Sequence, residues 1–159
     1  MKILVLSDSH QSNISLNFSA YDLVIHCGDY GRSYPLLLQK NVKFVKGNCD
    51  LLGNEHQVFD YFNKKIFITH GHKENIKFYY YKLYMQAMEY SANICFFGHT
   101  HQQEYFVENN IMFINPGSFP NNYVEIDEEK IIFYGKVNKV IKYRWWNNVL
   151  KWNFTFRKK

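Results

Sequence analysis

Five short apolar runs in this chain are each followed by a cluster of Asp, His, Asn and Gly residues. The clusters are Asp8-Ser9-His10, Gly28-Asp29, Gly47-Asn48-Cys49-Asp50, His70-Gly71-His72 and Gly98-His99-Thr100-His101. Such short runs are typical of buried strands. In an open α/β sheet, ligands bind beyond the carboxyl ends of parallel strands. These side chains, far apart in the sequence, are therefore expected to converge on one place.

The pattern of apolar positions favours a layered α/β fold. Strand-like runs at Lys2–Ser7, Asp22–His26 and Val42–Lys46 surround a helical stretch at Ser33–Lys40, as in parallel strands joined by crossover helices. A second helix is predicted at Asn75–Ser91, where apolar residues fall near one face. The other predicted strands are His56–Phe62 and Lys65–Thr69 around a turn at Asn63-Lys64, then Ile94–Phe97, Glu104–Val107, Ile111–Ile114, Tyr123–Ile126 and Ile131–Val137, with turns at Asn109-Asn110 and Asp127–Lys130.

The last stretch, Lys139–Phe156, predicts a hairpin around Asn147-Asn148 with one aromatic and one basic face. The aromatic face would comprise Ile141, Tyr143 and Trp145 on the first arm and Leu150, Trp152, Phe154 and Phe156 on the second. Residues 130–159 carry nine basic and no acidic side chains, whereas residues 1–129 carry a net negative charge. The hairpin could pack on a sheet edge, cover a second subunit, or attract nucleic acid.

Length and composition indicate one folded domain over residues 1–159. A chain of 159 residues, 47% hydrophobic and 21% charged, can bury a core without disulfides. Cys27, Cys49 and Cys95 form no CxxC pair, which is typical of free thiols in a reducing compartment. No apolar run reaches the length of about 18 residues that a membrane span needs, and Asp8 comes too early for a signal peptide. We therefore expect a cytoplasmic protein with no membrane partner.

The residue types in the five clusters predict a metal site. Asp, His and Asn side chains suit divalent ions such as Mn²⁺, Fe²⁺, Ni²⁺ or Zn²⁺. A single cluster is a weak signal, because a lone histidine is more often structural than a ligand. Seven such groups at strand ends exceed what one ion needs once water is included. Two ions that share a carboxylate accommodate them, and such a pair, about 3.5–4 Å apart, promotes phosphoryl displacement.

The ordered motifs DSH, GD, GNCD, HGH and GHTH resemble those of the calcineurin-like metallophosphoesterase superfamily, particularly its small bacterial and archaeal phosphodiesterases of the YfcE type. The resemblance runs from residue 1 to about 134 and includes Asn115-Pro116-Gly117-Ser118, a loop typical of that branch. It implies a four-layer α/β/β/α sandwich of two mixed β-sheets flanked by helices, with the hairpin as a C-terminal extension. It also implies a metal-dependent phosphoesterase with two divalent ions, Mn²⁺ being favoured over Ni²⁺, Fe²⁺ or Zn²⁺.

Carried over position by position, the resemblance assigns seven metal ligands. Asp8, His10 and His101 would hold one ion, Asn48, His70 and His99 the other, and Asp29 would bridge them. A water or hydroxide between the ions would be the nucleophile. Asp29, Asn48 and His72 are the expected catalytic residues, with His72 facing the substrate or making a structural hydrogen bond. Asp50 would orient its loop or a ligand, or cap a turn, and His26 and His56 are interpreted as structural or surface histidines.

One departure from the superfamily concerns substrate choice. Cys49 stands where many phosphomonoesterases have a histidine that protonates the leaving group. Diesters with good leaving groups depend less on such an acid, so Cys49 favours a small phosphodiester substrate over a monoester. A nuclease is less favoured, because those relatives generally add DNA-binding domains. Nucleic acid is accordingly the less favoured partner, and a homo-oligomer (dimer or tetramer) is expected.

The alternative from a different class is a non-catalytic scaffold, like the subunit of the retromer complex that shares this fold. A scaffold under no catalytic demand is expected to lose metal ligands. All seven positions hold ligand residues in this chain, which favours the enzyme.

Overall fold

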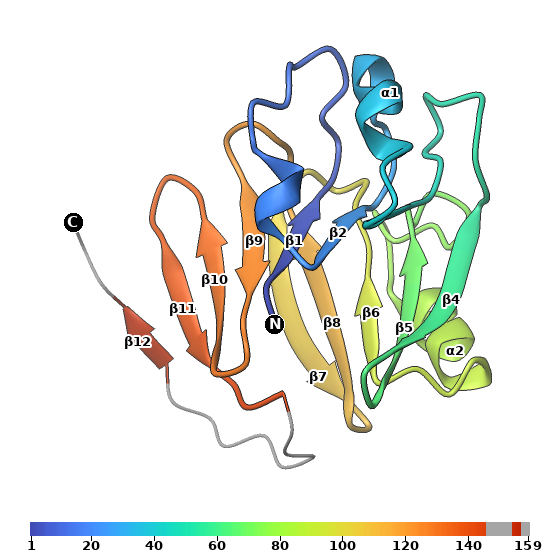
Figure 1. Cartoon of the computed structure of the whole chain (residues 1–159). Coiled ribbons are helices and arrows are strands. Elements are labelled where there is room, and N and C mark those ends of the chain that lie inside the picture. Colours follow the sequence, from blue (N-terminus) through green and yellow to red (C-terminus); the bar gives the residue numbers. More distant parts are fainter. Residues whose placement is uncertain (146–153, 157–159) are drawn as a thin grey trace.

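A computed structural model of the chain describes residues 1–145 and 154–156, and their strands form two sheets packed face to face (Figure 1). The first sheet has the order β12-β11-β10-β9-β1-β2-β3. Its strands are β1 (Ile3–Leu6), β2 (Leu23–His26), β3 (Val42–Phe44), β9 (Tyr123–Ile126), β10 (Lys130–Tyr134), β11 (Lys139–Lys142) and β12 (Phe154–Phe156). Strands β1, β2 and β3 run parallel, and the remaining pairs are antiparallel.

The second sheet has the order β4-β5-β6-β8-β7, with a parallel centre and antiparallel edges. Its strands are β4 (His56–Tyr61), β5 (Lys64–Thr69), β6 (Ile94–Phe96), β7 (Gln103–Glu108) and β8 (Ile111–Pro116). Both sheets are therefore mixed, as expected. The predicted turn at Asn63-Lys64 is one residue too late: Lys64 already pairs with Tyr61, and Phe62 takes the left-handed turn conformation (φ 51°).

Apolar residues on both faces of the sheets define the layers. On β1, Ile3 and Val5 point into the core between the two sheets, whereas Leu4 and Leu6 join a second cluster on the opposite face. A strand buried on both faces reads as an unbroken apolar run, which is why these residues show no alternation. The carboxyl ends of the parallel strands of both sheets lie at one edge of the sandwich (Figure 1).

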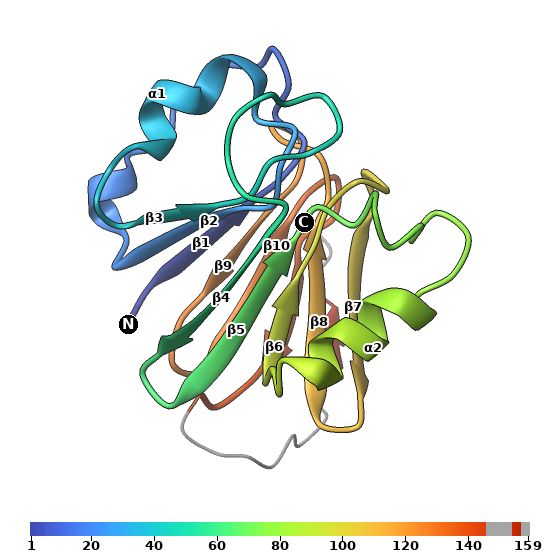
Figure 2. The same ribbon diagram turned by 90° about the vertical axis from the view of Figure 1, so that its right-hand side faces the viewer.

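Helices cover the two outer faces, which completes the predicted four layers (Figure 2). The first sheet is covered by α1 (Tyr34–Leu37) and the single-turn 3₁₀ helices η1 (Phe18–Ala20) and η2 (Gly31–Ser33), and the second by α2 (Tyr81–Glu89). No helix among the described residues has the length and apolar character needed to cross a membrane.

Both helices are shorter than predicted. The helix expected at Ser33–Lys40 is reduced to the four residues of α1. The helix expected from Asn75 begins only at Tyr81, because Asn75 itself is left-handed (φ 57°) and turns interrupt the segment. Ile76 is still buried, but it reaches the core from a turn that packs against Gly71. The apolar spacing of this segment thus reflects burial from a loop as well as from a helix.

The C-terminal segment extends the first sheet. Strand β11 pairs with β10, and β12 pairs with β11 through Ile141 and Phe154. Tyr143 and Trp145 are buried in the core between the sheets. The first arm of the predicted hairpin therefore packs on the sandwich, which favours the first of the three interpretations. The predicted turn at Asn147-Asn148, and Leu150 and Trp152, lie outside the described residues.

Replacing Trp145 by alanine is expected to lower the free energy of unfolding by about 3–5 kcal/mol, because a fully buried aromatic side chain is lost and a cavity remains. The indole stacks edge-on against Tyr61 and Tyr143, with ring centroids 6.2 Å away in both cases. Urea unfolding measures the change, and Trp145→Phe should lose less. Unchanged stability in Trp145→Ala would show that this arm contributes little to the core.

Candidate metal centre

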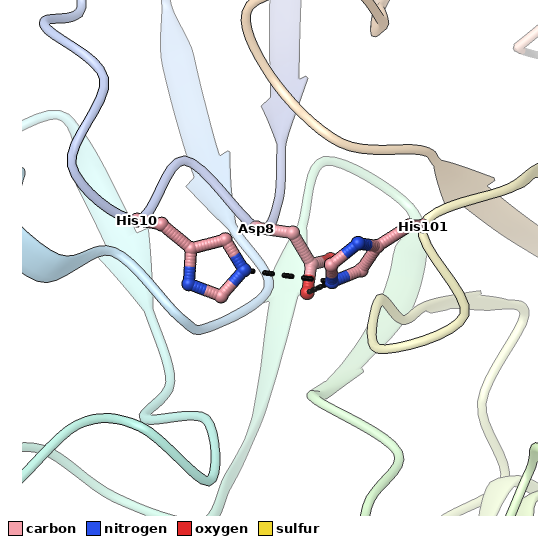
Figure 3. Close-up of side chains that lie close together, drawn as sticks. All are labelled: Asp8, His10 and His101. Carbon is pink, nitrogen blue, oxygen red and sulfur yellow. Dashed lines mark hydrogen bonds and ion pairs between the residues drawn. The ribbon is translucent and has the colours of Figure 1, made fainter.

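The five polar clusters of the sequence meet at one edge of the sandwich, as expected. Those that follow β1, β2 and β3 come from the first sheet, and those that follow β5 and β6 come from the second. The expected convergence of the first and last clusters is seen directly: Asp8 lies between His10 and His101 (Figure 3). The site is therefore built from both sheets and belongs to neither alone.

Asp8, His10 and His101 form the first group of potential ligands. Their donor atoms all lie within 4.8 Å of one another. The Nε2 atom of His101 is 3.1 Å from Oδ1 of Asp8 and 3.5 Å from Nε2 of His10 (Figure 3). Asp8 is fully buried, whereas the two imidazoles are partly exposed, so this group opens towards solvent.

Asp29 lies between the first group and a second one. Its Oδ2 atom is 4.0 Å from Nε2 of His10 and 3.4 Å from Nε2 of His70. Its other oxygen, Oδ1, accepts a hydrogen bond of 2.8 Å from the backbone N–H of Cys49. Burial would raise the pKa of Asp29, but His70 and the Cys49 N–H outweigh it and hold the pKa well below its usual range. Asp29 is thus a carboxylate with one oxygen turned to both groups.

His70 is the centre of the second group. Its Nδ1 atom lies 2.8 Å from the carbonyl oxygen of Cys27, to which only an N–H can donate, so the neutral ring has its lone pair on Nε2. That Nε2 is 3.2 Å from Oδ1 of Asn48, itself an acceptor. Burial would lower the pKa of His70, but Asp29 and Asp8 outweigh it and raise the pKa. The neutral ring, with its lone pair on Nε2, is the form that can bind a cation.

His99 lies beside His70, with ring centroids 5.0 Å apart. It belongs to none of the described groups whose donor atoms lie within 4.8 Å of one another. Burial, followed by the neighbouring His70 and Lys77, lowers the pKa of His99 to about 4. The ring is therefore neutral near pH 7, which is the form that binds metals.

The chemistry of these groups fits divalent cations. Adjacent ligands of an ion with bonds of about 2.1 Å lie about 3 Å apart, and the closest pairs of donor atoms here are 3.1 and 3.2 Å apart. In the second group an imidazole lone pair, an amide oxygen and a carboxylate oxygen face one another. Oδ1 of Asp8 is buried without a hydrogen-bond partner, an arrangement that a cation would satisfy.

The backbone at the site is strained in a way that the sequence does not reveal. Five of the converging residues adopt left-handed conformations: Asp8 (φ 51°), His10 (φ 45°), Asp29 (φ 54°), His99 (φ 67°) and His101 (φ 61°). Such conformations cost free energy for residues other than glycine and cluster at functional sites. Cross-loop hydrogen bonds hold them, including those from the N–H of Asp8 to Gly28 and from the N–H of His10 to Asp29.

Two glycines allow the loops to approach the carboxylates. A Cβ atom on Gly47 would lie 2.1 Å from Oδ1 of Asp29. A Cβ atom on Gly98 would lie 2.0 Å from Oγ of Ser7 and 2.8 Å from Oδ2 of Asp8. The glycines that precede Asn48 and His99 are therefore required by close packing.

His26, interpreted from the sequence as structural or surface, is buried and joins two loops of the site. Its Nδ1 atom accepts a hydrogen bond from the N–H of Gly28, so Nε2–H donates to Oγ of Ser9 at 3.0 Å. The Ser9 hydroxyl in turn donates to the carbonyl of Tyr30. Burial, aided by His70, lowers the pKa of His26 to about 3, which keeps this arrangement uncharged. His56 instead forms a hydrogen bond of 3.1 Å with the Tyr90 hydroxyl.

Asp50 orients the loops that follow β2 and β3, which is one of its predicted roles. Its carboxylate accepts hydrogen bonds from the backbone N–H groups of Gly47 at 2.8 Å, and of Tyr30 and Gly31 at 3.2 Å. It therefore ties the loop after β3 to the loop after β2.

His72 lies beside the two groups of donors. Its ring centroid is 5.4 Å from that of His70, and its Nε2 atom is 3.6 Å from Oε2 of Glu55. Nδ1 of His72 is buried without a hydrogen-bond partner. Burial and the neighbouring His70 lower the pKa of His72, which favours a neutral ring.

The thiol of Cys49 is a donor that the ligand prediction omitted. Its sulfur forms a compact group with His10 and Asp29, all donor atoms lying within 4.8 Å of one another. The residue is exposed, and Asn48 donates a hydrogen bond of 3.3 Å to its Sγ. Burial and the nearby Asp29 raise the pKa of Cys49, so the thiol rather than the thiolate is favoured. The position of Cys49 in a GNCD motif gives the only sequence signal for its closeness to the site.

Comparison with known proteins identifies the family. Residues 1–134 match the model of the calcineurin-like phosphoesterase superfamily domain. A probable metallophosphoesterase of Mycoplasma genitalium, MG207, is 34% identical over 125 residues, which cover 74% of this chain and 77% of the relative. The phosphodiesterase MJ0936 of Methanocaldococcus jannaschii is 29% identical over 144 residues, covering 74% and 83%.

Solved structures with a similar fold agree with the match to this family. A predicted phosphoesterase of Streptococcus pneumoniae superposes with a TM-score of 0.74 at 31% identity, over 89% of this chain and 97% of the other. Vacuolar protein sorting 29 of Cryptosporidium parvum superposes with a TM-score of 0.69 over 99% and 98%, but at 18% identity it shows the fold alone. The family match and the convergence of acidic, amide and imidazole groups together establish that this chain belongs to the calcineurin-like phosphoesterase superfamily and is a metal-dependent phosphoesterase.

Proposed function

We propose that this chain is a phosphodiesterase that works with two divalent cations. The observation that carries the proposal is the position of Asp29, whose Oδ2 atom lies 4.0 Å from Nε2 of His10 and 3.4 Å from Nε2 of His70. A single carboxylate oxygen placed between two groups of donors suits a pair of ions that share one ligand.

In this proposal each ion has its own set of protein ligands. Asp8, His10 and His101 hold one ion, Asn48, His70 and His99 hold the other, and Asp29 is common to both. When bound, the two cations supply Lewis-acid activation of water and neutralise charge on the phosphoryl oxygens. The hydrogen bond from Nδ1–H of His70 to Cys27 fixes the ring so that Nε2 faces its ion. His72, outside both sets, would face the substrate, and its ring centroid lies 5.4 Å from that of His70.

The preference for diesters rests on the residue after Asn48. Cys49 is exposed at the site, and its pKa is raised, so it is a weaker proton donor than an imidazolium would be. A diester with a good leaving group does not require protonation of that group. One of the relatives, MJ0936, is itself named a phosphodiesterase.

The direct test compares the hydrolysis of bis(p-nitrophenyl) phosphate and of p-nitrophenyl phosphate by the protein supplied with Mn²⁺. We expect kcat/KM to be higher for the diester by about tenfold or more, an activation difference of about 1.4 kcal/mol. EDTA should abolish the activity, and added Mn²⁺ should restore it. Faster turnover of the monoester would contradict the diester preference, and turnover that survives chelation would contradict the dependence on metal. A panel of nucleotides, cyclic nucleotides, phosphorylated sugars and lipid head-group diesters would then identify the substrate.

A protein-interaction scaffold is the alternative, and the site weighs against it. The buried Oδ1 of Asp8 has no hydrogen-bond partner, and several donor residues have a left-handed backbone; both features reduce stability. A scaffold gains nothing from these features, whereas a metal centre requires them. Mn²⁺ as the resident ion, a homo-oligomer and a cytoplasmic location stay predictions.

A further inference from the structure

At the metal centre, the loop that carries His99 and His101 has two left-handed residues other than glycine, as does the loop of Asp8 and His10. Both histidines are left-handed, and Thr100 is the residue between them. His101 reaches towards Asp8, with Nε2 3.1 Å from Oδ1, whereas the ring of His99 lies against that of His70. One three-residue loop thus supplies His101 to the first group of donors and places the ring of His99 beside His70. Because a left-handed backbone is unfavourable for histidine, other contacts must hold the loop in this conformation.

Those contacts converge on the hydroxyl of Thr100. It donates a hydrogen bond of 2.8 Å to Oε1 of Glu104 and accepts one of 3.0 Å from Nδ2 of Asn115. The same amide group of Asn115 also donates to the carbonyl of Gly98 at 2.8 Å. The hydroxyl also accepts a hydrogen bond of 3.3 Å from the backbone N–H of Gln102, so its donor and both of its acceptor positions are occupied. These bonds fix Thr100 relative to the second sheet.

The sheet register explains why Glu104 and Asn115 reach the same hydroxyl. These two residues are directly paired on the antiparallel strands β7 and β8, so their side chains leave the sheet on the same face. The second carboxylate oxygen of Glu104 accepts a hydrogen bond from the Tyr80 hydroxyl. The Tyr80 ring packs against Phe97 and Phe106 beneath α2, with ring centroids 5.9 and 5.3 Å away. A connected chain of contacts thus runs from the outer core to the metal loop.

We propose that Glu104 is a positioning residue of the metal centre, which acts with Asn115 through the Thr100 hydroxyl to orient His99 and His101 towards their ions. This inference rests on the proposed two-metal function. Glu104 touches neither donor group; its carboxylate instead holds the hydroxyl between the two histidines in place. Residues that orient metal ligands typically change metal affinity or activity by about 10–100-fold when they are replaced.

The decisive substitution is Thr100→Val, which keeps the shape of the side chain and removes its hydroxyl. We expect the Kd for Mn²⁺, measured by titration calorimetry, to rise by about 10–100-fold. Thr100→Ser restores the hydroxyl and should bind Mn²⁺ like the wild type. Glu104→Gln, which leaves a single acceptor oxygen for two hydroxyl donors, should fall in between and provides a second test if Thr100→Val does not fold. The matched control is Glu108→Gln, the same change at an exposed position of β7.

Two further readouts separate positioning from a general loss of stability. The activity that Thr100→Val and Glu104→Gln lose at limiting Mn²⁺ should be recovered at saturating Mn²⁺, and their melting temperatures without metal should match those of Thr100→Ser and Glu108→Gln respectively. Wild-type affinity for Mn²⁺ in both variants would overturn the inference while leaving the proposed function intact. A wild-type chain that binds no Mn²⁺ would overturn both.

Discussion

The Asp29→Ala variant is expected to hydrolyse bis(p-nitrophenyl) phosphate at least about a thousandfold more slowly than the wild type, which corresponds to a loss of about 4 kcal/mol of transition-state stabilisation. The reason is the position of Oδ2 of Asp29 between His10 and His70, where the proposed ions would lose the carboxylate that they share. His70→Ala should be similarly inactive. Steady-state kinetics with saturating Mn²⁺ measures the effect.

The fold should survive the change, because the carboxylate of Asp29 lies in the loop after β2 and not in the core clusters. Circular dichroism and the melting temperature of the metal-free protein check this point. Asp60→Ala, which removes an exposed carboxylate on β4, is the matched control and should keep full activity. Undiminished turnover in Asp29→Ala would refute the assignment of the site.

The Cys49→His variant is expected to shift the ratio of monoester to diester hydrolysis towards the monoester by about tenfold or more, since general acid catalysis contributes about 10²–10⁴-fold. Residue 49 is exposed beside Asp29 and His10, so an imidazole there lies close to the reacting phosphoryl group and can protonate a poor leaving group. The ratio of kcat/KM for p-nitrophenyl phosphate and bis(p-nitrophenyl) phosphate is the measurement.

Cys49→Ser separates the imidazole from the loss of the thiol. It removes the sulfur but supplies no imidazole, so its substrate ratio should stay at the wild-type value. An unchanged ratio in Cys49→His, with metal binding retained, would show that this position does not set the preference for diesters.

The position of the site could be predicted because its ligands follow strands. A short apolar run that ends at Asp8-Ser9-His10 predicts a strand and places these polar residues at its carboxyl end. The run before Gly28-Asp29 does the same. Once the strands are parallel, the ends must meet. The apolar pattern alone favours only a layered α/β fold, and the four layers are implied by the resemblance to the superfamily.

Features that depend on backbone conformation could not be predicted from the sequence. The left-handed φ angles of His99 and His101 are imposed by hydrogen bonds from distant residues, and histidine gives no local signal for them. The hydrogen bonds of Thr100 to Glu104 and Asn115 depend on the register of β7 and β8, which local patterns do not specify. The helix predicted at Asn75–Ser91 begins only at Tyr81 for a related reason, because apolar spacing cannot distinguish a helix from a turn that buries Ile76.

Anomalous diffraction from crystals grown with Mn²⁺ would locate the bound ions in this protein. We expect two manganese peaks per chain, one among Asp8, His10 and His101 and one among Asn48, His70 and His99, with the carboxylate of Asp29 between them. A single peak, peaks at other residues, or no peak when Mn²⁺ is abundant would overturn the two-metal site.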